Sequence, residues 1–301
     1  MMVPINISEQ RLELLAKTFG CSKGTLPFTY LGLPLGTTKP RIIDFMPLVS
    51  KCERRLGGIS AMLNQAGRLQ IKNVVLSALP TFYMCTMEIP KAMIKQIDTF
   101  RKNCLWRASN VNGRTQPKAA WKLVCGPKVE GGLGIINLED QNQTLLMKNL
   151  DKFFNMADIP WVNMIWEKHY KNGKLPSEVK KGSFWWRDIL KLLTKFKELA
   201  QVQIGDGKTC YFWKDQWATQ TMLQSFPQAH SFAKNRLITV HGAFNQEDTF
   251  SLFNLPLSQQ AFQQVTNIQH KIDSIELNEH KDIWTYFHKK FAYKSAIAYK
   301  W

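Results

Sequence analysis

The sequence predicts a mainly α-helical chain with small β elements, an α+β fold. Apolar residues recur at helical spacings of three and four from about residue 40 to 150, whereas only a few short stretches alternate as strands do. The chain has 301 residues, 45% of them apolar, which is enough for about two packed domains. Glycine and proline punctuate the first 38 residues and therefore predict short elements there.

The first elements are a short helix around Ser8–Phe19 and a strand over Phe28–Leu35. Three helices follow. The first is capped by Asp44 and ends at Gly57-Gly58, the second starts near Ala66 and is interrupted by Pro80, and the third begins at Pro90. On the third helix, one face is apolar (Ile89, Met93, Ile97, Phe100, Cys104) and the basic residues lie elsewhere (Lys91, Lys95, Arg101, Lys102).

The second half of the chain is less regular. Residues 107–120 read as a loop, and a glycine-rich turn at 131–134 precedes a helix that contains Leu145 and Leu150. A tryptophan-rich stretch spans 160–190, and Gly205-Asp206-Gly207 predicts the turn of a β-hairpin. Residues 218–281 are polar and weakly patterned, so we expect a mobile stretch with short elements.

The formal net charge of +17 is unevenly distributed. Residues 39–128 carry 16 lysines and arginines against 4 aspartates and glutamates. Such a concentration attracts polyanions, and nucleic acid is the commonest of them. A solubilising surface is the alternative, whereas an anionic membrane fits poorly because the basic residues spread over several helices. No secretory signal or membrane span is visible, so we expect a nuclear or cytoplasmic protein without a membrane partner.

The residues offer no evident active site. The six cysteines are scattered, no two closer than 19 positions, and no histidine has a second one within short reach, so we expect no metal site. The chain has no Asp-Asp pair, and Glu139-Asp140 and Glu247-Asp248 suit a helix start or a loop better than a metal clamp. We therefore expect no catalytic residue, no cofactor and no small-molecule substrate.

Five strings carry a more specific signal, in this order: FTYLGLPLG, AGRLQIKNVVLSALPTFYM, IPKAMIKQIDTFRKNCLW, AAWKLVCGPKVEGGLGIINLEDQN and GDGKTCYFWKDQW. Together they resemble the C-terminal part of plant LINE-type (non-LTR) retrotransposon reverse transcriptases. The resemblance covers nearly the whole chain, from about residue 3 to 301.

The resemblance implies four segments. Residues 1–38 would be a remnant of the palm edge, 39–108 a thumb-like helical bundle, and 109–217 a helical connector with a tryptophan-rich hairpin. Residues 218–301 would be a linker and the truncated start of the zinc-binding reverse-transcriptase module. The aromatic-x-Asp-Asp motif that holds the catalytic magnesium in the family is absent from this sequence, as are the Cys and His ligands of the zinc module. The family's polymerase activity therefore does not transfer to this chain.

A thumb contacts the phosphates of a template–primer duplex, so nucleic acid (RNA–DNA hybrid or duplex) is the expected partner and lysine and arginine the expected contacts. Arg68 and Lys72 are four residues apart and would share a helix face. The other candidates are Lys51, Arg54, Arg55, Lys91 and Lys95, and ordinary solvated side chains are the alternative for each. Trp213 and Trp217 could stack on single-stranded bases, although core packing suits them better. Two further readings stay open: an inert relic that acts through exposed protein-interaction surfaces, and a part that complements a separately encoded palm.

Overall fold

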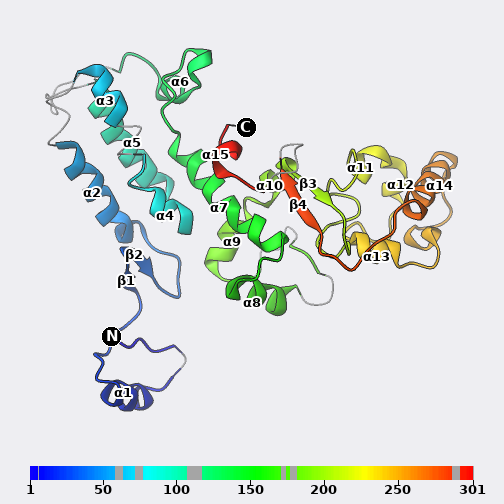
Figure 1. The fold of residues 1–301 in the computed structure, drawn as a ribbon, viewed down its shortest axis with the longest axis horizontal. Coiled ribbons are helices and arrows are strands. Elements are labelled where there is room, and N and C mark those ends of the chain that lie inside the picture. The colour runs from blue at the N-terminus through cyan, green and yellow to red at the C-terminus, as the bar shows by residue number, and fades with distance from the viewer. Residues whose placement is uncertain are drawn as a thin grey trace. The chain divides into compact units, whose positions relative to one another are not determined.

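The computed structural model describes residues 1–5, 7–57, 64–71, 77–106, 117–170, 174–176, 182–286 and 292–300. The chain divides into two compact units, Met1–Gln143 (unit 1) and Thr144–Trp301 (unit 2). As predicted, the described residues are mainly helical, with two small antiparallel sheets of two strands each (Figure 1). The four segments expected from the resemblance stay predictions.

Unit 1 begins with the predicted helix, α1 (Glu9–Thr18), whose N-cap Ser8 accepts a hydrogen bond from the Arg11 amide. The single strand predicted over 28–35 is wrong. Two strands, β1 (Phe28–Tyr30) and β2 (Leu33–Leu35), form a hairpin with Phe28 opposite Leu35. The chain reverses at Leu31 and Gly32, which have φ angles of +50° and +85°. A two-residue turn with positive φ angles matches the twist of the two strands, and it usually contains Asn, Asp or Gly. Because its first position here is Leu31, the sequence gives no signal for the turn.

The predicted helices of unit 1 pack around α5 (Lys91–Trp106). The 3-10 turn η1 (Ile42–Phe45) and helix α2 (Met46–Gly57) contact α5, and so does α3 (Gln65–Ile71) (Figure 1). Pro80 is the N-cap residue of α4 (Thr81–Thr86), and α5 starts directly after Pro90, as predicted. Helical spacing predicts that this helix turns Phe45, Leu48, Val49, Cys52 and Leu56 inward. The first four are buried, and the side chain of Leu56 lies outside the described residues.

Arg101 corrects the predicted charge pattern of α5. It lies four residues after Ile97 and therefore on the apolar face, where its side chain is fully buried. The guanidinium donates to the Asp98 carboxylate at 2.7 Å, to the Ser77 hydroxyl at 3.2 Å and to the Ile136 carbonyl at 2.6 Å. This arginine is part of the core of unit 1 and is not available to a polyanion.

The end of unit 1 is held by backbone contacts and one amide side chain. Helix α6 (Trp121–Cys125) and the 3-10 turn η3 (Lys128–Glu130) precede α7 (Leu138–Phe154), and the predicted glycine-rich turn lies between η3 and α7. The buried Asn142 accepts from the Ile89 amide at 2.9 Å and donates to the Met84 and Met87 carbonyls, both at 3.0 Å. These bonds fix the connection between α4 and α5 against α7.

Unit 2 has an aromatic core. It is built by α7 together with α8 (Pro160–His169), α9 (Phe184–Leu190) and α10 (Leu193–Leu199). The ring of Phe153 stacks on that of Trp166 with 4.4 Å between the ring centres, and the ring of Phe154 stacks on that of Phe196 with 5.6 Å between the ring centres. Trp213 and Trp217 are also buried, so they serve the core as the sequence favoured.

The hairpin predicted at Gly205-Asp206-Gly207 is wrong. Strand β3 (Ala200–Gln203), which precedes these glycines, pairs with β4 (Ile283–Tyr286) near the other end of unit 2, with Val202 opposite Trp284 (Figure 1). The buried Asp282 explains the pairing. Its carboxylate accepts from the Gly205 and Gly207 amides at 2.8 and 2.9 Å, and from the amide and hydroxyl of Thr209 at 2.9 and 2.8 Å.

Residues 218–281 are more regular than expected. They form four short elements, α11 (Met222–Ser225), α12 (Pro227–Ser231), α13 (Val240–Phe244) and the 3-10 turn η4 (Thr249–Leu252), and a longer helix, α14 (Gln259–Asp273). Helix α14 buries Ala261, Val265 and Ile268 against the core and packs on α12. Its polar face is rich in glutamine, which weakened the sequence pattern. The short elements were predicted; the 15-residue helix was missed.

Candidate nucleic-acid interface

Three of the predicted residues share one side of α2. Lys51, Arg54 and Arg55 have the spacing i, i+3, i+4, and all three are exposed. The burial of Leu48, Val49 and Cys52 fixes the rotation of α2 and so keeps this side in solvent. Within the described part of the chain, no carboxylate forms an ion pair with any of the three. The two arginines also lie in the last turn, where positive charge favours the helix by about 0.3–1 kcal/mol.

Helix α5 presents two more of the predicted residues. Lys91 and Lys95 are four residues apart and exposed. Lys91 Nζ lies 2.7 Å from Glu139 Oε1, and the hydrogen bond to Glu139 raises the pKa of Lys91. An ion pair between exposed side chains is weak in water, so a phosphate can compete with Glu139 for this lysine.

The remaining predicted pair is only partly placed. Arg68 lies on α3 and is half-buried, while Lys72 lies outside the described residues. The described candidates therefore lie on α5 and on α2 and α3, which both contact α5. The exposed ones are Lys51, Arg54, Arg55, Lys91 and Lys95.

The sequence reasoning overlooked Arg41, which precedes η1. Its side chain is 77% exposed and lies only loosely against Asp44, at 3.9 Å. It belongs to the same basic stretch, 39–128, and that was the available signal. Arg41 is the N-cap residue of η1, and its backbone amide donates to the Asp44 carboxylate at 2.7 Å.

The described residues hold no group of three or more His, Cys, Asp or Glu that could bind a metal ion. Burial raises the pKa of Cys52 to about 11. The pKa of Cys210 is also raised, by burial and by the nearby carboxylates of Asp282 and Asp215. Both thiols are therefore protonated at neutral pH and are poor nucleophiles or metal ligands. The expectation of no metal and no catalysis stays a prediction.

None of the helices in the described part of the chain has the length and apolar character of a membrane span.

Comparison with known proteins finds two relatives, both from Arabidopsis thaliana. The chain is 29% identical over 182 residues to "Putative ribonuclease H protein At1g65750"; the match covers 58% of this chain and 29% of that protein. It is 26% identical over 143 residues to "Uncharacterized mitochondrial protein AtMg00310", covering 46% of this chain and 92% of that protein. The chain thus spans less than a third of the length of the ribonuclease H protein. No family model matches the chain.

Proposed function

We propose that this chain derives from a plant LINE-type retrotransposon and binds nucleic acid through its phosphates, without sequence preference and without catalysis of its own. The observation that carries the proposal is the exposed side of α2, where Lys51, Arg54 and Arg55 have no described ion-pair partner. Side chains of this kind make backbone contacts that supply affinity and no base readout. One relative is named as a ribonuclease H protein, and a nucleic acid is the substrate of any ribonuclease, which supports the same setting.

The mechanism is electrostatic. Each phosphate that a lysine or arginine neutralises releases condensed counterions, so the logarithm of affinity falls with the logarithm of salt by about 0.9 per contact on duplex DNA. Lys91 and Lys95 add further charge on α5, which packs against α2. No magnesium-binding carboxylate cluster enters this mechanism.

The test compares two triple variants that remove equal charge. The first is Lys51→Ala, Arg54→Ala and Arg55→Ala on α2. The control is Lys168→Ala, Lys174→Ala and Arg187→Ala, three exposed residues of unit 2. Fluorescence anisotropy with a labelled RNA–DNA hybrid and a duplex DNA of equal length is followed from about 50 to 200 mM salt.

The α2 variant should bind both probes more weakly and lower the salt slope by up to about 0.9 for each side chain removed. The control variant should change the slope by less than half as much. Equal effects of the two variants would mean that net charge alone attracts the nucleic acid, and the α2 interface would be refuted. Circular dichroism checks that alanine leaves the helix intact.

A second candidate function rests on exposed apolar side chains in unit 1. Tyr30 and Leu31, at the tip of the β1–β2 hairpin, are 57% and 74% exposed, and Phe82 on α4 is 49% exposed. The Tyr83 hydroxyl donates to the Gly32 carbonyl, which places the hairpin beside α4. An apolar area of this kind favours protein binding. Nucleic-acid binding that is absent, or unaffected by salt, would favour this function.

A further inference from the structure

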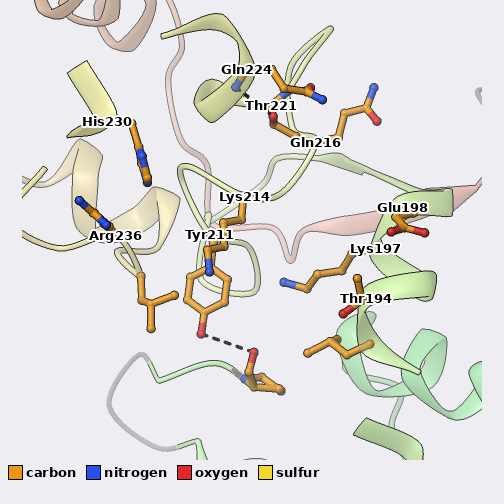
Figure 2. Close-up of a pocket in the computed structure, with 13 residues that line it drawn as sticks. Thr194, Lys197, Glu198, Tyr211, Lys214, Gln216, Thr221, Gln224, His230 and Arg236 are labelled. Carbon is orange, nitrogen blue, oxygen red and sulfur yellow. Dashed lines mark hydrogen bonds between the residues drawn. The ribbon is translucent and has the colours of Figure 1, made fainter. Parts of the chain in front are cut away.

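Unit 2 contains a pocket that the sequence did not indicate. Its volume is about 850 Å³, which lies within the usual range for small-molecule sites. Helix α10 forms one wall with Leu193, Thr194 and Glu198, and the segments that follow β3 and α12 form the other (Figure 2). The lining combines apolar side chains with amides, hydroxyls and cations.

One of the pocket's cations is already committed to the fold. Lys197 donates to both carboxylate oxygens of the buried Asp215, at 2.7 and 2.9 Å, and lies 4.7 Å from the centre of the Tyr211 ring. The Tyr211 hydroxyl in turn donates to the Leu175 carbonyl at 3.0 Å. Lys197 is therefore a structural residue, and its charge is neutralised by Asp215.

Two other cations are not neutralised. Lys214 and Arg236 line the pocket, are exposed, and have no ion-pair partner among the described residues. Both lie near His230, which also lines the pocket and whose ring packs against Trp213 at 5.1 Å. His230 Nε2 is buried and has no described hydrogen-bond partner.

The electrostatics agree with this arrangement. Burial lowers the pKa of His230, and the charges of Arg236 and Lys214 lower it further. Positive charge thus accumulates at this end of the pocket, while the exposed Glu198 lies on the α10 wall. An anion is favoured at the His230 end and disfavoured beside Glu198, so a bound ligand would have a defined orientation.

We propose that this pocket binds a phosphate-bearing ligand of nucleotide size, with its phosphate between Lys214 and Arg236 and its apolar part against Leu193, Tyr211 and Leu237. Lysine and arginine are the usual partners of phosphate, and His230 adds a third positive charge when it is protonated. The free nucleotide and the phosphorylated end of a strand present the same chemistry. This inference is independent of the α2 interface, which belongs to unit 1.

Calorimetric titration of the whole chain tests the proposal with adenosine 5′-monophosphate and, as the matched ligand without phosphate, adenosine. The nucleotide should bind at least about 10-fold more tightly than adenosine, which corresponds to about 1.4 kcal/mol. The variant Lys214→Gln, Arg236→Gln should lose this preference, whereas Lys168→Gln, Arg187→Gln, which removes equal charge elsewhere in unit 2, should keep it. Equal binding of the two ligands, or an unchanged preference in the pocket variant, would overturn the proposal.

Two further arms of the titration give the source of the phosphate and the role of His230. A tetranucleotide with a 5′-phosphate, compared with the same strand without it, shows whether a strand end binds better than the free nucleotide. Sulfate, which keeps its charge from pH 7.5 to 5.5, should bind more tightly as the pH falls, because protonated His230 joins Lys214 and Arg236. The other charged groups of the pocket are Glu198 and Lys197, which is paired with Asp215. The gain should vanish in His230→Gln; if it persists there, His230 has no part in the site.

Discussion

Replacing Asp282 by alanine should strongly destabilise unit 2. The side chain is 2% exposed and accepts four hydrogen bonds, all between 2.8 and 2.9 Å, from Gly205, Gly207 and Thr209. Alanine would leave three buried amides without an acceptor. It would also release the loop that follows β3 from the start of β4.

The expected loss is about 3–5 kcal/mol, because each buried amide left without an acceptor costs about 1–3 kcal/mol and such costs are not fully additive. Hydrogen bonds to a charged group contribute about 1.5–3 kcal/mol each, so four of them summed independently would exceed this range. The smaller figure is the appropriate one because such bonds are not additive and water can enter the vacated site. Asp282→Asn keeps the shape and one acceptor oxygen, so we expect it to cost about 1–3 kcal/mol.

Urea unfolding followed by tryptophan fluorescence measures the effect. Of the tryptophans, only Trp106 and Trp121 lie in unit 1, so the signal reports mainly on unit 2. The control is Glu279→Ala, which removes the same charge from an exposed position three residues away and should stay within about 0.5 kcal/mol of the native protein. If Asp282→Ala unfolds at the same urea concentration as this control, the assigned role of the carboxylate is wrong.

Four other expectations are open to measurement. Arg101→Met should destabilise unit 1 by about 3–5 kcal/mol in the same urea experiment read by circular dichroism, because Asp98 and the Ile136 carbonyl lose their buried partner. Folding lowers the pKa of His230 from its usual 6.5, so the unfolded chain binds more protons at this residue than the folded chain does. Unit 2 should therefore lose stability as the pH falls from about 6.5 through the lower folded pKa. The variant His230→Gln should lose less stability over the same pH range. The purified chain should extend no primed template with magnesium or manganese, and extension above a boiled control would contradict this. Metal analysis after dialysis should find well under one zinc per chain, since the cysteines and histidines offer no close pair.

Local signals predicted the helices of unit 1 well. Ser8 is an N-cap, Pro90 occupies the position before α5, and the spacing of Leu48, Val49 and Cys52 identified the buried side of α2. Each of these depends on residues within a few positions of one another, which is the range that a sequence pattern covers. The exposed basic side of α2 followed from the same spacing.

Features that depend on distant residues escaped prediction. The partner of β3 comes about 80 positions later, and no pattern around Gly205 indicates Asp282. Arg101 was placed off the apolar face of its helix, although it follows Ile97 by four residues. Its burial depends on partners from other parts of the chain, such as the Ile136 carbonyl. The pocket was missed for the same reason: its lining runs from Pro176 to Leu237, and these residues meet only in the folded chain.

The pairing of β3 with β4 sets the order of events during synthesis of the protein. The amides of Gly205 and Gly207 emerge from the ribosome 75–77 residues before the carboxylate of Asp282 that accepts from them. At about 5–20 residues per second, this delay lasts roughly 4–15 seconds. During that interval β3 has an open edge, and the aromatic rings that Trp284 later covers, Phe154 and Phe196, lack one of their neighbours. The nascent chain therefore exposes this strand edge to chaperones and proteases until β4 is made.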